Sequence, residues 1–234
     1  MRYRLPRQNI NSEINKVITR EARKQSFTLS RASKLDLKEM VEVMRAIERS
    51  GLPKHLVCKK LSDKLGYGIF LHPDAAPLKK GQVIAPYAGE VSIVPQATFA
   101  ESSYAFAPIE EMLLTREEQQ RFSKKEKYHP KRHYSLRIDA DKKGNFTRFI
   151  NHSDKPNVIV YLLTIPPNPY NLEPARIEVV YTVKKTIQPG EQLLVNYEAD
   201  GEKSYWGAVK IKPFSMNPQT FTLSPSLKVV KSHS

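Results

Sequence analysis

Two kinds of periodicity divide the chain. Near the N-terminus, apolar residues recur at spacings of three and four over residues 9–25 and 35–49, a pattern typical of amphipathic helices. Ser33 precedes the second pattern and Gly51 follows it, as helix-capping residues commonly do. The spacing therefore predicts a helical N-terminal appendage over 1–56.

From residue 57 onward the pattern changes to short runs of β-branched and aromatic residues, separated by Gly, Pro, Asn and Asp. Such runs predict short strands, so the fold class is β-rich with a few helices. The predicted strands are HLVCKKL (55–61), YGIFL (67–71), VIAPYAGEVSIV (83–94), YSLRIDA (134–140), NVIVYLLTI (157–165), RIEVVYTV (176–183) and EQLLVNY (191–197).

Between the third and fourth runs, residues 95–133 are polar and read as a helical insertion that begins with a glutamate-rich stretch. The last residues, 208–234, contain spaced prolines and lysines and are predicted to be a loosely ordered basic tail. The β-rich part is therefore expected to form one domain over 57–207.

The composition excludes several kinds of binding site and membrane segment. The 234 residues contain a single cysteine, Cys58, which excludes disulfides within the chain and cysteine-rich zinc sites. No run approaches the roughly 18 apolar residues of a membrane span, and the basic start of the chain lacks the apolar segment of a Sec-type signal peptide. We therefore expect no metal and no membrane association.

The net charge of +14 is unevenly distributed. Residues 1–56 contain 13 Lys/Arg against 6 Asp/Glu, and residues 207–234 contain four lysines and no acid. Basic ends favour phosphate-rich partners, so non-specific contact with nucleic acid is one reading and a merely solvated surface is the other. The apolar stripes of the two predicted helices also leave a homodimer open.

Two segments carry the most specific signal. RFINHSDKPN, Arg148 to Asn157, places a polar Asn151-His152 pair after a hydrophobic approach and before a turn. About forty residues later, GEQLLVNY runs from a Pro-Gly turn into a short apolar strand that ends on Tyr197.

This pair of segments resembles the signature motifs of the SET domain, the fold of most protein-lysine methyltransferases. The resemblance implies a fold of short strands with a knot-like C-terminal threading that brings Asn151, His152 and Tyr197 to one site. Two further segments match in order: LGYGIF, which resembles the G-x-G turn, and PYAGEV, in which Pro86 replaces the usual acid of the family pattern.

The resemblance also implies roles for individual residues. Tyr197 and Tyr87 are the predicted catalytic residues. The cofactor would be S-adenosylmethionine, bound by Gly66, Tyr67, Gly68, Asn151, His152, Tyr197 and Trp206, with the His152 main chain at the adenine and Trp206 stacked on that ring. The substrate channel would be lined by Tyr87, Tyr134, Val160, Tyr161, Tyr181 and Val195.

Two of these positions bear on the number of methyl groups added. Relatives restrict it with a phenylalanine or tyrosine where this chain has Val160 and Val195. Valine fills less space than an aromatic ring, so di- or trimethyllysine is the expected product, unless Tyr161 or Tyr181 closes the channel.

The expected function is methylation of lysine-rich proteins, such as histones or bacterial histone-like proteins, by an enzyme most similar to the short zinc-free SET proteins of chlamydiae. Two alternatives stay open: a catalytically idle SET fold that binds chromatin or a nucleoid, and a methyltransferase of a non-histone protein. The expected location is the bacterial cytoplasm, or a host cell and its nucleus after export by a route that the sequence does not reveal.

Overall fold

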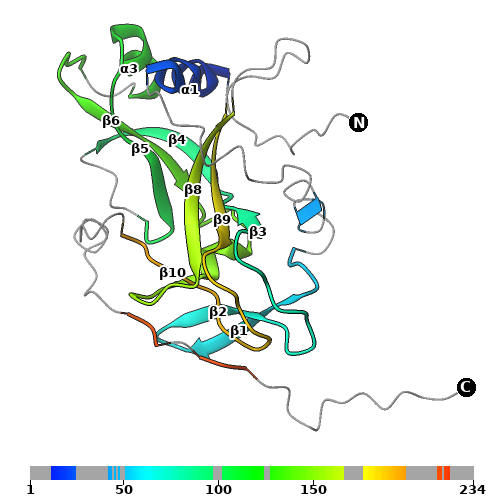
Figure 1. The fold of residues 1–234 in the computed structure, drawn as a ribbon. Helices are drawn as coiled ribbons and strands as arrows, with labels where there is room; N and C mark the ends of the chain where they lie inside the picture. Colours follow the sequence, from blue (N-terminus) through cyan, green and yellow to red (C-terminus); the bar gives the residue numbers. More distant parts are fainter. Residues whose placement is uncertain are drawn as a thin grey trace, which may run out of the picture.

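The computed structural model describes residues 12–24, 42–43, 45, 47, 51–96, 102–123, 127–165, 176–198, 215–217 and 219–221. Strands dominate this part of the chain and helices are few, so the predicted β-rich class is confirmed (Figure 1). The helices are α1 (Ser12–Lys24), α3 (Arg116–Phe122) and the 3-10 helix η3 (Phe146–Phe149).

Within the described residues, the strands form four small sheets rather than one large sheet. Their orders are β1-β2, β10-β7, β3-β9-β8 and β4-β6-β5. All pairings are antiparallel except that between β7 and β10, which is parallel. The strands are β1 (Leu56–Ser62), β2 (Gly66–Leu71), β3 (Val83–Pro86), β4 (Glu90–Pro95), β5 (Ala105–Leu113), β6 (His133–Asp139), β7 (Asn151–His152), β8 (Val158–Ile165), β9 (Arg176–Val183) and β10 (Leu194–Val195).

The run predicted as one strand over 83–94 is divided into β3 and β4. A Cβ atom at Gly89 would lie 2.5 Å from the Asp139 carbonyl oxygen, so only glycine permits this close approach of β6. Asn145 holds the preceding bend, because its side-chain amide donates to the Pro86 carbonyl at 2.8 Å. The bend therefore turns Tyr87 into the core.

The first predicted helix is present as α1, and its apolar stripe is covered by the chain itself. Ile14, Val17 and Ile18 are buried against a cluster on the sheet strands that includes Ile109 and Leu136. An ion pair between Arg20 and Glu118, 2.5 Å apart, joins α1 to α3. This stripe is consequently not available for the dimer that the sequence left open.

Most of the second predicted helix lies outside the described residues. The four positions that are described, 42, 43, 45 and 47, are helical. Val43 and Ile47 pack against the main core. The division of the chain at residues 56 and 207 stays a prediction.

The insertion over 95–133 is only partly helical. The helix α3 begins at Thr115 with a reciprocal capping box to Glu118. The glutamate-rich part is instead β5, which pairs with β6. Its register shifts between Phe106 and Ile109, and again before Met112, so the alternation of buried and exposed residues is broken. That irregularity conceals the strand in the sequence.

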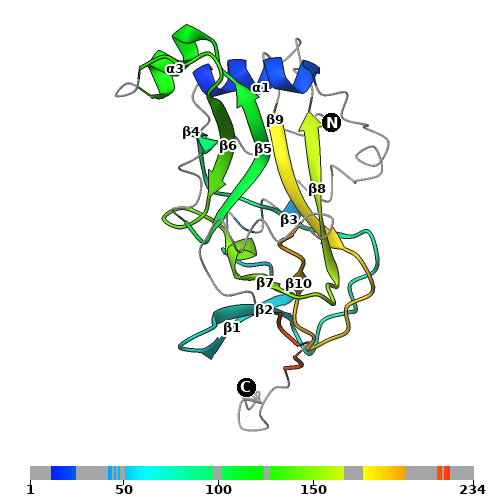
Figure 2. The same ribbon diagram turned by 90° about the vertical axis from the view of Figure 1, so that its left-hand side faces the viewer.

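The segment that contains β10 crosses the centre of the domain beside β7, and we call these two paired strands the crossing. Leu194 and Val195 pair with Asn151 and His152, although more than forty residues separate the two strands. Leu193 donates its main-chain N–H to the Ile69 carbonyl at 2.8 Å, which joins the crossing to β2. Figure 2 shows β7 and β10 between the β1-β2 hairpin and the larger sheets.

Candidate active site

The crossing joins four of the predicted site residues, Tyr67, Asn151, His152 and Tyr197, by hydrogen bonds. The Asn151 side-chain amide donates to the Tyr67 carbonyl at 2.8 Å. The Tyr197 main-chain N–H donates to His152 Nδ1 at 3.1 Å, and the Tyr197 hydroxyl donates to the Ile150 carbonyl at 3.0 Å. Residues from β2, β7 and the end of β10 therefore fix one another.

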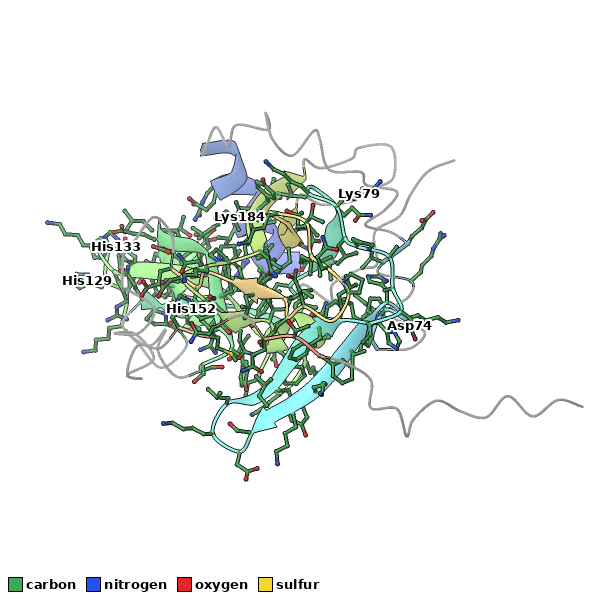
Figure 3. All side chains as sticks on the ribbon, turned by 60° about the horizontal axis from the view of Figure 1, so that its bottom comes forward. Asp74, Lys79, His129, His133, His152 and Lys184 are labelled. Atoms are coloured by element: carbon green, nitrogen blue, oxygen red, sulfur yellow. The ribbon has the colours of Figure 1, made fainter. Side chains whose placement is uncertain are left out.

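His152 is a structural group in this arrangement. Its side chain is buried, and burial lowers the pKa of the imidazole below its usual range, against a smaller opposing effect of Asp154. Because Nδ1 accepts from Tyr197, the proton is on Nε2, which lies 3.4 Å from an Asp154 carboxylate oxygen. His152 is thus neutral, and it orients the Tyr197 backbone. Figure 3 labels His152 apart from His129 and His133.

The main chain of His152 is engaged as well. Its carbonyl accepts from the Met216 N–H at 3.1 Å, and the Ser153 hydroxyl donates to the Met216 carbonyl at 2.8 Å. One of the main-chain groups that the resemblance assigns to adenine therefore already has a protein donor.

The surroundings of Asn151 and of the glycine turn fit the amino-acid end of S-adenosylmethionine. Both bonds that the structure gives the Asn151 side chain use its nitrogen, and within the described residues its oxygen has no donor, which leaves it to accept from an ammonium group. Gly66 adopts a positive φ of 68°, and no heavy atom of the described residues lies within 4 Å of the position a Cβ would occupy. Open space thus adjoins the turn.

Gly68 has a different reason to be glycine. A Cβ at this position would lie 2.7 Å from the Gln192 side-chain nitrogen. The residue therefore permits close packing of β2 against the crossing segment. Of the two glycines, only Gly66 leaves room for a ligand.

A pocket opens beside Tyr197. Its volume, counted together with the open space at its mouth, is about 470 Å³. Five predicted residues meet there: Tyr87, Val160, Tyr181, Val195 and Tyr197. The other lining residues are Ser103, Tyr104, Ala105, Phe106, Thr147, Arg148, Ile150 and Asn196.

Aromatic rings form the deep wall of the pocket. Tyr87 and Tyr181 are stacked with centroids 5.9 Å apart, and Phe106 is tilted against Tyr87 at 6.2 Å. The Tyr87 hydroxyl donates to the Tyr104 carbonyl at 2.6 Å. The Arg148 guanidinium lies over the Tyr104 ring, 4.0 Å from its centroid. Ring contacts and the hydrogen bond of Tyr87 therefore hold this wall of the pocket in place.

Two predicted channel residues lie elsewhere. Tyr134 is completely buried among the residues that α1 covers, because its position in β6 points away from the pocket. Tyr161 packs against Val83, Leu163 and Val180 on the other face of its sheet from Val160. Adjacent strand residues face opposite sides, so Val160 and Tyr161 could not both line the channel. Trp206 lies outside the described residues.

Sequence reasoning missed the contribution of β5 and the loop before it. Tyr104 and Phe106 were placed in a helical insertion, whereas they form part of the pocket wall. The alternation of aromatic and small residues in YAFAP was the available signal for a strand here.

Metal chemistry has no ligand set in the described part of the chain. No group of three His, Cys, Asp or Glu side chains is placed there to hold an ion. Among the same residues, no helix has the length and hydropathy required to span a membrane.

Comparison with known proteins agrees with this geometry. A family model of the SET domain matches residues 66–198. SET domain-containing protein 4 of Saccharomyces cerevisiae is 26% identical over 176 residues, 74% of this chain and 29% of that protein. Histone-lysine N-methyltransferase Su(var)3-9 of Drosophila pseudoobscura is 27% identical over 158 residues, 67% of this chain and 22% of that protein.

The chain therefore spans less than a third of the length of these relatives. Among solved structures, ATXR5 in complex with a mono-methylated histone H3.1 aligns with 71% of this chain and 68% of its own. Its identity is 19% and the TM-score is 0.45.

Proposed function

Because this chain belongs to the SET domain family, we propose that it is an S-adenosylmethionine-dependent protein-lysine methyltransferase. The observation that carries the proposal is the pocket in which Tyr87 and Tyr181 meet Tyr197 at the crossing of β7 and β10. When bound, S-adenosylmethionine supplies a methyl group on a positively charged sulfur. Asn151 and the turn at Gly66 are the proposed holders of its amino-acid end.

The pocket residues would prepare a lysine side chain in two ways. An alkyl ammonium has a reference pKa of about 10.4, so it must lose a proton before its nitrogen can act as a nucleophile. The stacked rings of Tyr87 and Tyr181 replace water around the amine and so lower that pKa. As fixed walls of the pocket, these rings also restrict the direction from which the amine approaches, and orientation supplies a large part of the rate in such reactions.

Tyr197 is the proposed catalytic residue at the inner end of the pocket. Two hydrogen bonds hold it, one from its main-chain N–H to His152 and one from its hydroxyl to the Ile150 carbonyl. A hydroxyl fixed in this way stabilises a polarised group without having to reorganise during the reaction. Tyr87 has a positioning role, because its own hydroxyl is directed at Tyr104.

We propose lysine-rich proteins, histones or bacterial histone-like proteins, as the substrates. The name of one relative, a histone-lysine N-methyltransferase, supports this choice. A chain of net charge +14 needs local acid to dock a basic segment. Glu198 follows Tyr197 directly, and Glu110 is exposed on β5, the strand that lines the pocket at its start.

Because the sequence has a single cysteine, we propose the zinc-free type of the family, similar to the short SET proteins of chlamydiae. For such a protein we propose the bacterial cytoplasm as the site of synthesis and export to a host cell as an option. Fractionation of cells that express a tagged chain would test the second part.

Mass spectrometry of labelled methyl transfer tests the proposed activity. The purified protein is incubated with labelled S-adenosylmethionine and a panel of core histones, bacterial histone-like proteins and small ribosomal proteins. Transfer to lysine in the first two groups, and its loss in Tyr197→Phe, is the expected result. Transfer to ribosomal proteins alone would favour a non-histone enzyme. A failure to transfer to any member would favour an idle binding module.

A further inference from the structure

Four lysines gather where two loops far apart in sequence run side by side. Lys79 and Lys80 lie in the loop between β2 and β3, and Lys184 and Lys185 lie in the loop after β9. All four are exposed. Figures 1 and 2 show both loops together at the end of the molecule away from α1 and α3, and Figure 3 labels Lys79 and Lys184. We name these four residues the lysine turns.

Main-chain hydrogen bonds fix the lysine turns relative to each other. On one side, Leu78 and Ile187 exchange two bonds of 3.0 Å. On the other, the Gly81 N–H donates to the Val183 carbonyl at 2.8 Å, and the Val183 N–H donates to Gln82 at 2.9 Å. Each lysine pair therefore lies between two points at which its loop is attached to the other. The surface is preformed rather than assembled on binding.

The positive charge of the lysine turns is not neutralised by the acidic side chains of the same loops. Within the described residues, the lysine turns make no ion pair. Asp74, in the same loop as Lys79, lies 3.9 Å from His72 instead. Glu191, in the same loop as Lys184, accepts from the Gln188 N–H. Like charges on two bonded loops repel one another, and a bound polyanion relieves that repulsion.

The partner must be strongly anionic but need not offer an apolar surface. Every large apolar side chain that is exposed in the described part of the chain lies outside the two loops: Leu65, Tyr67, Leu113, Tyr128 and Leu162. Neither loop contains a phenylalanine, tyrosine or tryptophan on which unpaired bases could stack, and the one imidazole, His72, accepts from the Asp74 N–H. The loops also lack the apolar groups that enter a lipid bilayer.

We propose that the lysine turns bind the phosphate backbone of a double-stranded nucleic acid, independently of base sequence. A duplex presents a dense, regular row of phosphates, and each lysine that neutralises one releases condensed counterions. This surface belongs to the folded domain, in contrast to the basic ends of the chain. It does not depend on methyl transfer.

A matched pair of variants of the full chain tests the inference. The first, Lys79→Gln/Lys80→Gln/Lys184→Gln/Lys185→Gln, removes the lysine turns. The second, Lys127→Gln/Lys131→Gln/Lys142→Gln/Lys143→Gln, removes the same charge at four other exposed lysines. Binding of a fluorescent DNA duplex is measured without donor or substrate, over roughly 50 to 200 mM salt.

For the first variant, we expect the slope of log affinity against log salt to fall by about two to four, and the Kd to rise at least about tenfold. The second should stay within about twofold of the parent, as expected when phosphate contacts are not removed. Equal losses in both variants, or none in the first, would overturn the proposal. So would a loss confined to a single-stranded oligonucleotide or to vesicles rich in anionic phospholipid.

Discussion

The crossing of β7 and β10 and the sheet β4-β6-β5 differ in the kinds of side chain that hold them together. The sheet has an apolar core, to which α1 adds Ile14, Val17 and Ile18. The crossing also buries apolar residues, but beside them it buries the polar groups Asn151, His152 and Asn157, each bonded to a partner far away in sequence. Polar groups buried in this way fix a geometry rather than merely a volume. The proposed chemistry therefore resides at the crossing, whereas the sheet supports one wall of the pocket.

A buried amide performs the same task in each region, which makes the comparison testable. Asn157 donates to the Gln192 carbonyl and accepts from the Leu194 N–H, both at 2.8 Å. Gln119 donates to the carbonyls of Leu114 and His129 and accepts from the His129 N–H. The first joins the loop after β7 to β10 and the residues before it, whereas the second joins α3 to the loop before β6.

The largest effect is expected from Tyr197→Phe. If the hydroxyl acts mainly in the transition state, turnover should fall by about 100-fold or more while donor binding changes little. Tyr161→Phe is the matched control, because Tyr161 lies on the other face of its sheet. Rapid-quench and steady-state assays with a lysine peptide measure both. Near-normal turnover in Tyr197→Phe would transfer the catalytic role to another residue, with Tyr87 the first to examine.

Removal of the two buried amides should separate function from stability. Asn157→Ala and Gln119→Ala each leave buried main-chain groups without a partner, at a cost of about 1–3 kcal/mol in the free energy of unfolding. Only Asn157→Ala should also weaken methyl transfer, because Leu194 pairs directly with Asn151. Urea unfolding and peptide assays at a temperature where both variants are folded give the two quantities. Equal activity in the two variants would contradict the division between the regions.

Acid should loosen the crossing through His152. Since burial holds the pKa of His152 below its unfolded value of about 6.5, the unfolded state takes up the proton first, and stability falls as pH decreases through this range. Protonated Nδ1 can no longer accept from the Tyr197 N–H. His55, whose pKa is also lowered by burial, acts in the same direction.

His152→Asn isolates the contribution of this residue, because an amide does not titrate in this range. Melting temperatures between about pH 5 and 8 should decrease less steeply on acidification in the variant than in the parent protein. Identical slopes would mean that groups elsewhere dominate. Asp154 and Glu198 both act to raise the pKa of His152, so replacing either should lower it further.

The smallest change concerns the number of methyl groups. Val160 and Val195 line the pocket together with Tyr181. Di- or trimethyllysine is the expected product, and Val160→Phe should shift it toward monomethyllysine because the ring occupies the space of an added methyl group. Time-resolved mass spectra with excess donor report the distribution. Products that stop at one methyl group in the unchanged protein would indicate that Tyr181 already closes the channel.

The residues of the crossing could be predicted from the sequence, whereas the pocket residues at the start of the sheet β4-β6-β5 were missed. Asn151, His152 and Tyr197 could be found because each of the two segments that contain them is a contiguous motif that resembles the SET signature. Tyr104 and Phe106 are harder to find, because the two register shifts of β5 after Phe106 break the alternation that begins in YAFAP. The lysine turns could not be found, since the two loops meet only through main-chain bonds formed in the folded chain.

Calorimetric titration with S-adenosylmethionine tests the central claim, that the crossing assembles a donor site, most directly. The unchanged protein and Gln119→Ala should bind. Asn151→Ala should bind at least about tenfold more weakly, because it loses an acceptor for the charged amino group. Equal affinity in all three proteins, or no heat of binding in any, would contradict the account.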